Sequence, residues 1–156
     1  MNRLALTRRL YLILLGTALC GLLFYAVLLP YFIWQCYPHD RFASWVCLTL
    51  LWLSAAPCYR VLFLGRRIVR NIGCDRSFCE ENAHLLRKIS TLAAADALYI
   101  FLANPLLILL GIYETVFLPI SVITVFIGIA ISVAAAAMSH LVLRAAELQE
   151  QSDLTI

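Results

Sequence analysis

The stretch GCDRSFCEENAHLLRKI, residues 73–89, is the longest hydrophilic interval in an otherwise apolar chain. Gly73 suits the left-handed conformation that often follows the end of a helix. Ser77 and Glu80 have the spacing of a capping box, in which each side chain accepts a hydrogen bond from a free backbone amide. Glu80 and Glu81 also place negative charge in a first helical turn, where the helix dipole favours it. The stretch therefore predicts a helix end, a tight turn and a helix start.

On both sides of this hairpin the chain is too apolar for a soluble domain. Of its 156 residues, 63% are hydrophobic and 13% are charged, and the mean hydropathy is +0.91. Ordinary globular chains are about 45–50% apolar and about 25% charged. The apolar residues form runs long enough to cross a bilayer, which takes about 20 residues of helix. We therefore predict one all-α membrane domain over residues 1–156, without a basic tract for direct nucleic-acid binding.

Four apolar segments predict a polytopic bundle of four transmembrane helices. They cover residues of about 10–34, 43–72, 78–112 and 115–150. The first follows Arg3, Arg8 and Arg9, as a signal peptide would, but signal cores span about 7–15 residues and this run is longer. We therefore interpret it as a retained helix. On the hairpin side, the second, third and fourth helices are expected to extend beyond the lipid as cytoplasmic helical extensions.

The distribution of basic residues predicts the orientation. Arginine and lysine concentrate at the N-terminus and around the hairpin, whereas the first loop carries only Arg41 and the loop after the third helix carries none. Cytoplasmic loops have an excess of these residues. We therefore expect both termini and the hairpin to face the cytoplasm, in a multi-pass protein of the bacterial inner membrane.

Asp96 is the candidate for intramembrane chemistry. It falls in the inner half of the third helix, where an aspartate costs about 2.5–3.5 kcal/mol on insertion scales and so calls for a partner. Arg60 has a comparable depth in the second helix, which predicts an Asp96–Arg60 ion pair. A structural pair is the simpler interpretation. The alternative is a proton or cation site, as in a small transporter or ion-coupled permease.

The six cysteines form no recognisable metal or redox motif. No Cys-x-x-Cys pair occurs, which argues against a thiol oxidoreductase. Cys74, Cys79 and His84 are separated by four residues each, which is not a standard zinc spacing. Paired acids, a nucleophile with its base and a phosphate loop are also absent from the sequence. We therefore expect neither a metal, nor a cofactor, nor an enzyme.

Small residues recur along the fourth helix at spacings of three and four. They are Ser121, Thr124, Gly128, Ser132, Ala135 and Ser139. Small residues at this period let helices approach closely in lipid. The pattern predicts close packing, either within one chain or at a homodimer face.

The second arm of the hairpin has one apolar face. Its residues are Phe78, Asn82, Leu85, Leu86 and Ile89. Packing of this face on the inner end of the bundle is the simpler interpretation. A docking surface for a cytosolic protein is the functional alternative.

Two motifs in this region resemble a known family. FCEEN at residues 78–82, followed by LRKI at residues 86–89, is similar to the F-S/T-x-E-N-x-x-x-L-R-x-I signature of a bacterial membrane family, domain of unknown function 2975. The ending ELQEQSDLTI, residues 147–156, looks like the acidic ending of that family. The chain departs at Ser77, where the family commonly has proline, and at Cys79, where it has serine or threonine. The resemblance covers four helices, hairpin and tail.

That family has no established activity. Its members are often encoded beside small helix-turn-helix regulators, which implies a membrane-bound partner or sensor for a transcription factor. From this resemblance we expect a cytoplasmic face that binds such a regulator. The expected contacts are Phe78, Glu80, Glu81, Asn82 and Arg87 in the hairpin, and Glu147, Glu150 and Asp153 in the tail.

Overall fold

The computed structural model describes residues 3–74, 77–112 and 116–153, with side chains from Thr7 to Gln151 within these ranges. Every regular element in this part of the chain is a helix, which confirms the all-α prediction. The elements are α1 (Arg3–Leu23), the π-helical segment η1 (Phe24–Leu28), α2 (Leu29–Cys36), α3 (Arg41–Gly73), α4 (Glu80–Leu109) and α5 (Phe117–Asp153). Because α1, η1 and α2 follow one another without a break, the chain forms four rods.

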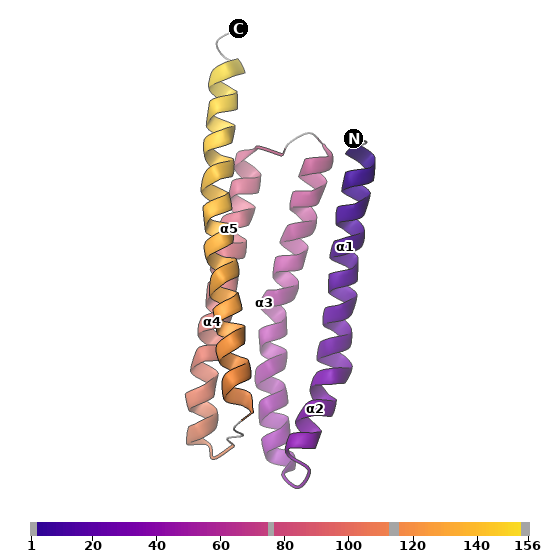
Figure 1. Cartoon of the computed structure of the whole chain (residues 1–156), viewed down its shortest axis with the longest axis vertical. Coiled ribbons are helices and arrows are strands. Elements are labelled where there is room, and N and C mark those ends of the chain that lie inside the picture. Colours follow the sequence, from indigo (N-terminus) through magenta and orange to yellow (C-terminus); the bar gives the residue numbers. More distant parts are fainter. Residues whose placement is uncertain (1–2, 75–76, 113–115, 154–156) are drawn as a thin grey trace.

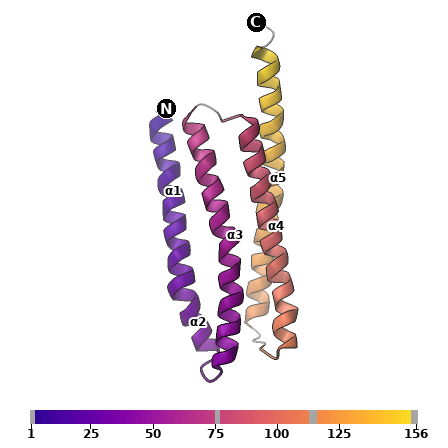
Figure 2. The same ribbon diagram turned by 180° about the vertical axis from the view of Figure 1, so that it is seen from behind.

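The rods are packed in chain order and alternate in direction (Figure 1). α1 packs on α3, α3 on α4, and α4 on α5, with the α4–α5 pair the most extensive. The α3–α4 hairpin and both ends of the chain lie at the same end of the molecule, where the last turns of α5 extend beyond the other helices (Figures 1 and 2). Within the described residues, no comparable packing joins α1 to α5. The bundle is therefore an open row.

All four rods are long and apolar enough to cross a membrane. The qualifying stretches are Thr7–Cys36, Arg41–Gly73, Glu80–Leu109 and Phe117–Gln151. Each overlaps one of the segments predicted from the sequence. α5 has 37 residues, which at about 1.5 Å per residue gives a rod of about 55 Å. A bilayer core is about 30 Å thick, so α5 has several turns to spare.

The hairpin begins and ends differently from the prediction. Gly73 keeps helical backbone as the last residue of α3, so the left-handed conformation expected there is wrong. A Cβ at Gly73 would lie 3.2 Å from Thr7 Cγ2, so this glycine instead permits the close approach of α1. The expected capping box is also wrong. Cys79 is the N-cap of α4, without a side-chain cap bond, and Ser77 lies two residues too early for that role.

The left-handed glycine lies at the opposite end of the molecule. Gly111, with φ of +69°, follows α4. Its amide donates to the Ile108 carbonyl at 3.0 Å, and the Ile112 amide donates to the Leu107 carbonyl at 3.0 Å. These two bonds make a Schellman motif, which satisfies carbonyls at the end of the helix. Tyr37 Oη then donates to the Ile112 carbonyl at 3.0 Å, which ties the α2–α3 loop to the end of α4.

A small hydrophobic core lies at this same end. It contains residues from α2, α3 and the end of α4, namely Leu29, Ile33, Ala43, Cys47, Leu48 and Ile112. α3 starts beside it with Asp40 as N-cap, whose Oδ1 accepts from the Ala43 amide at 3.1 Å. The end of the molecule away from the hairpin is therefore closed by apolar packing.

Candidate functional site

A buried pair of amides joins α3 to α4 at the hairpin. Asn71 Nδ2 donates to Asn82 Oδ1 at 2.9 Å, and Asn82 Nδ2 donates to the Ser77 carbonyl at 3.0 Å. Asn82 is only 2% exposed. Leaving such a buried group without a partner costs about 1–3 kcal/mol. We call Asn71, Asn82 and the Ser77 carbonyl the amide clasp, because together they fix the closure of the hairpin.

An exposed ion pair lies beside the amide clasp. Arg67 Nη2 is 2.7 Å from Glu81 Oε1, and Arg67 Nε donates to the same oxygen at 2.8 Å. The two side chains are 52% and 44% exposed. Exposed pairs contribute about 0.2–1 kcal/mol, so the buried amides are the stronger fastening.

A second polar contact between α3 and α4 lies deeper, at Asp96. Ser54 Oγ donates to Asp96 Oδ1 at 2.9 Å, and Cys58 Sγ donates to Oδ2 at 3.7 Å. Ser54 and Cys58 are four residues apart, so both lie on the face of α3 that meets α4. Both carboxylate oxygens of Asp96 therefore accept from neutral donors.

The expected Asp96–Arg60 ion pair is not formed. The pair recorded among the described residues is Arg67–Glu81, at the hairpin. The reason is helical register, because Arg60 follows Cys58 by two residues and so lies about 200° further around α3. Arg60 is exposed on that other face.

Asp96 lines a cavity of about 550 Å³. Side chains from η1, α2, α3, α4 and α5 surround it, and most of them are apolar. Its polar lining includes Asp96, Tyr25, Tyr99, Asn104 and Ser121. Tyr99 Oη donates to the Leu50 carbonyl at 2.9 Å, and Ser121 Oγ donates to Asn104 Oδ1 at 3.1 Å. The structure thus places the Asp96 carboxylate at the wall of a large apolar space.

The π-helical segment η1 shapes one wall of this cavity. Here the Leu29 amide donates to the Phe24 carbonyl, five residues back. In this register the Tyr25 carbonyl would be paired with residue 30, but Pro30 has no amide hydrogen. Trp52 Nε1 of α3 donates to that carbonyl instead, at 3.1 Å. Tyr25 is thereby held at the cavity, and its hydroxyl lies 3.9 Å from Cys58 Sγ.

The chain matches the model of a family described as protein of unknown function (DUF2975) over residues 32–156, well over half of its length. This chain belongs to the DUF2975 family. No curated protein and no solved structure matches it. The match begins within α2, so α1 and η1 lie outside it. The amide clasp and Asp96 both lie inside the part of the chain that matches DUF2975.

In this DUF2975 protein some signature residues hold α4 to α3, and the others are exposed at the surface. Asn82 is buried in the amide clasp, where its side chain is not exposed for a partner, so its expected partner contact stays a prediction. Glu81 is engaged with Arg67. Glu80 and Arg87 are exposed. Phe78 is 57% exposed, because it precedes the helix start and so does not share the buried face of α4.

The expected contacts of the tail lie on the projecting end of α5. Glu147 and Glu150 are exposed there, as is every residue from Glu147 to Gln151. Leu148, an apolar residue, is 66% exposed between them. Asp153 is the last residue of α5, and its side chain lies outside the described residues.

The small residues of α5 pack against α4 within the same chain. Ser139 Oγ donates to the Ala83 carbonyl at 2.8 Å, and Ser132 Oγ to the Ser90 carbonyl at 3.0 Å. A Cβ at Gly128 would lie 3.0 Å from the Ala97 Cβ. Ser121 bonds Asn104, as above, while Thr124 lines the cavity. Ser121, Gly128, Ser132 and Ser139 of this stripe therefore pack on α4, as the close-packing prediction expected, and the homodimer face stays a prediction.

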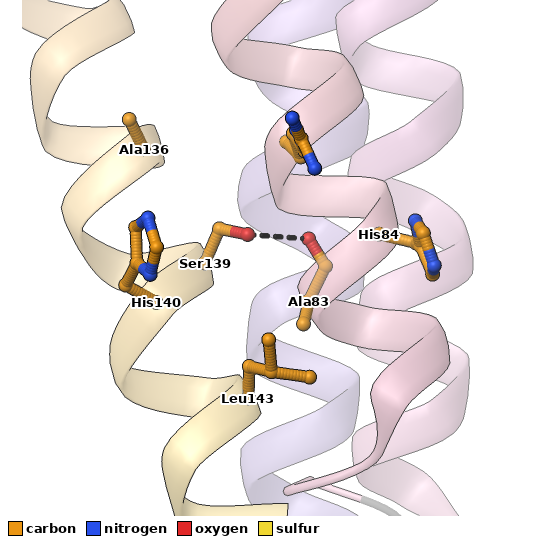
Figure 3. Close-up of a pocket in the computed structure, with 7 residues that line it drawn as sticks. Ala83, His84, Ala136, Ser139, His140 and Leu143 are labelled. Atoms are coloured by element: carbon orange, nitrogen blue, oxygen red, sulfur yellow. Dashed lines mark hydrogen bonds between the residues drawn. The ribbon is translucent and has the colours of Figure 1, made fainter.

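A shallow pocket of about 220 Å³ lies along this α4–α5 seam, near the hairpin. Figure 3 shows Ser139 facing Ala83 across the seam, with His140 and His84 to either side of the contact. The two imidazoles point away from each other (Figure 3). Among the described residues no three His, Cys, Asp or Glu side chains are grouped to hold a metal ion.

Three features of these sites were not identified from the sequence. Asn71 was not recognised as the partner of Asn82, although eleven residues separate them across one predicted turn. Ser54 and Cys58 were not connected with Asp96. Their spacing of four, one helical turn, is the signal that could have found them. The bond from Trp52 to the Tyr25 carbonyl was the third feature missed. Pro30, inside a long apolar helix, was its signal, because proline frees a backbone carbonyl that another group must satisfy.

Proposed function

We propose that this DUF2975 protein is a membrane-bound partner of a small cytosolic helix-turn-helix regulator. In this proposal the protein is not an enzyme. It lies in a bacterial inner membrane with both termini and the α3–α4 hairpin in the cytoplasm, as the basic residues at that end indicate. The regulator docks on the projecting end of α5 and on the neighbouring hairpin surface.

The projecting end of α5 is the observation that carries this proposal. It extends beyond the other helices (Figure 1), and Glu147, Leu148 and Glu150 are exposed on it. An exposed apolar side chain flanked by acids suits a protein partner better than lipid. DNA-binding modules carry a basic surface for phosphates. An acidic helix end complements that surface and would compete with DNA for it.

The hairpin adds a second part to the proposed docking surface. Phe78, Glu80 and Arg87 are exposed at the same end of the molecule. Glu81 contributes through its ion pair with Arg67, which orients the first turn of α4. Asn82 contributes indirectly, because the amide clasp holds the hairpin in place.

Affinity purification from the native cells tests this proposal. The tagged full-length protein, extracted in mild detergent, should retain a stoichiometric helix-turn-helix protein. Glu147→Gln/Glu150→Gln should lose it. Gln149→Lys/Gln151→Lys changes the net charge by the same amount without removing a carboxylate, so it should retain more of the regulator. A clean preparation without any regulator at native expression would contradict the proposal.

Asp96 supports a second candidate function, that of a small transporter or ion-coupled permease. The supporting observation is that this carboxylate lines the 550 Å³ cavity, with two neutral donors and no ion pair to Arg60. Intramembrane acids that face a cavity mark ion or substrate paths in many membrane proteins. Flux into proteoliposomes tests this function. Asp96→Asn should abolish any ion-driven flux, and unchanged flux would exclude Asp96 from the path.

A further inference from the structure

The cavity beside Asp96 combines a large apolar volume with a negative charge that no basic side chain among the described residues neutralises. We propose that this cavity binds a hydrophobic organic cation, whose charged atom pairs with Asp96 and whose apolar body fills the space between η1, α3, α4 and α5. This site is independent of the cytosolic partner, and it requires no transport. It therefore goes beyond both functions above.

The charge of Asp96 sets the sign of the ligand. Its two oxygens accept from Ser54 and Cys58, which are hydrogen-bond donors but carry no positive charge. Arg60 lies on another face of α3, and the part of the chain that the structure describes has no Asp96 ion pair. A carboxylate away from water is costly unless it is paired. A cationic ligand supplies the missing charge.

The walls of the cavity set the chemistry of the rest of the ligand. Small-molecule sites commonly measure about 300–1,000 Å³, are mostly apolar and carry a few polar groups; this cavity, at about 550 Å³, fits that description. The rings of Tyr25 and Tyr99 line it beside Asp96. Aromatic faces attract cations, including organic cations, and the attraction is stronger when ring and cation are both removed from water. A small metal ion is less suited, because Mg²⁺ or Ca²⁺ takes six or more oxygen ligands and Asp96 is the acidic residue of this lining.

Aromatic rings line the cavity toward the end away from the hairpin. The rings of Phe32 and Phe117 meet edge to face, with centroids 6.2 Å apart. Tyr37 stacks on Phe117 at 6.2 Å. Asn104 and Ser121, which line the cavity, are hydrogen-bonded to each other. The Asn104 amide and the Ser121 hydroxyl therefore do not require a polar group on the ligand. The ligand that fits is therefore a bulky cation with one charged centre and an otherwise apolar body.

Equilibrium binding of radiolabelled tetraphenylphosphonium to the full-length protein in phosphatidylcholine nanodiscs tests this inference. Binding should be saturable, one per protein, and above that of empty nanodiscs. Asp96→Asn should weaken it about thirtyfold or more, because removing one partner of a desolvated charge pair costs at least about 2 kcal/mol and each 1.4 kcal/mol is tenfold. Asp40→Asn removes a carboxylate outside the cavity and keeps the oxygen that caps α3, so it should leave the affinity unchanged. Tetraphenylborate, of similar shape and opposite charge, should show no saturable binding above empty nanodiscs when it is measured alone.

A second variant separates loss of the site from loss of the fold. Ala103 lines the cavity on α4, two turns from Asp96, and Ala103→Phe should block binding by filling the space while Asp96 remains. The proposal is overturned if the unmodified protein shows no saturable binding above empty nanodiscs. It is equally overturned if Asp96→Asn, folded by circular dichroism, binds as well as the unmodified protein. Should Asp96→Asn not fold, normal binding by Ala103→Phe overturns it.

Discussion

The amide clasp and the Asp96 contact join the same two helices, α3 and α4. The polar groups of the clasp are bonded to each other and buried, whereas the carboxylate of Asp96 still faces a cavity. At the clasp, Asn71 and Asn82 are buried and bonded to each other, and Asn82 also reaches the Ser77 carbonyl. At Asp96 the acid meets two neutral donors and otherwise faces a cavity. Buried polar groups that bond each other stabilise the fold. A carboxylate that faces a cavity without a positively charged partner can still bind a ligand. The difference therefore separates a structural region from a candidate binding region.

This difference also changes the meaning of the family signature. Phe78, Glu80, Glu81 and Asn82 of this signature were expected to provide partner contacts. In the structure Glu81 and Asn82 also fasten α4 to α3. Mutations in the signature would thus disturb a partner indirectly, through the hairpin, so binding defects there need a stability measurement beside them.

The largest expected effect comes from breaking the amide clasp. Asn82→Ala leaves the Asn71 amide buried without its partner, so the free energy of unfolding should fall by about 2–4 kcal/mol. Reversible unfolding of the purified protein in mixed micelles measures it. Asn71→Ala should act similarly, and the double variant should cost less than the sum of the two. Strictly additive losses would contradict a direct coupling of these amides.

The α4–α5 seam gives the next largest effect. Gly128→Ala should cost about 1–3 kcal/mol, because a Cβ there would lie 3.0 Å from Ala97 and must push the helices apart. Gly16→Ala is the matched control, since a Cβ at Gly16 meets nothing within 4 Å. It should be neutral or slightly stabilising. Equal effects of both substitutions in the same unfolding assay would refute close packing at Gly128.

The helices themselves could be predicted from the sequence, because long apolar runs and polar turns identify helices long enough to cross a membrane without knowledge of their neighbours. The partner of Asp96 could not, because it depends on how α3 is rotated about its axis. Depth alone suggested Arg60. The rotation instead brings Ser54 and Cys58 to α4, and only the tertiary packing determines that angle.

The hairpin shows a second limit of sequence analysis. Its position was predicted from Gly73 and the acids of the first turn. Its closure was not, since a capping box is a local pattern whereas the Asn71–Asn82 bond joins two helices. Likewise Gly111 was not distinguished from other glycines, although its left-handed backbone ends α4. Local patterns locate the ends of helices better than they identify the contacts that hold the helices together.

Asp96 should contribute little to stability if the comparison is correct. Asp96→Asn keeps an oxygen that accepts from Ser54 and removes a charge from apolar surroundings. We expect the free energy of unfolding to be unchanged or to rise by up to about 1 kcal/mol, because a charged side chain there is costly. The same micelle assay measures it. A loss as large as that of Asn82→Ala would show that Asp96 is a structural residue and would remove the distinction between the two regions.

The exposed ion pair should give the smallest effect. Glu81→Gln and Glu80→Gln each remove an acid from the first turn of α4, so both lose the same favourable interaction with the helix dipole. Only Glu81 pairs with Arg67. The difference between the two variants should therefore be about 0.2–1 kcal/mol, and it should shrink as salt screens the pair. Unfolding free energies compared at low and high salt measure this difference. If it exceeds the loss from Asn82→Ala, the ion pair and not the buried amide clasp is the main fastening of the hairpin.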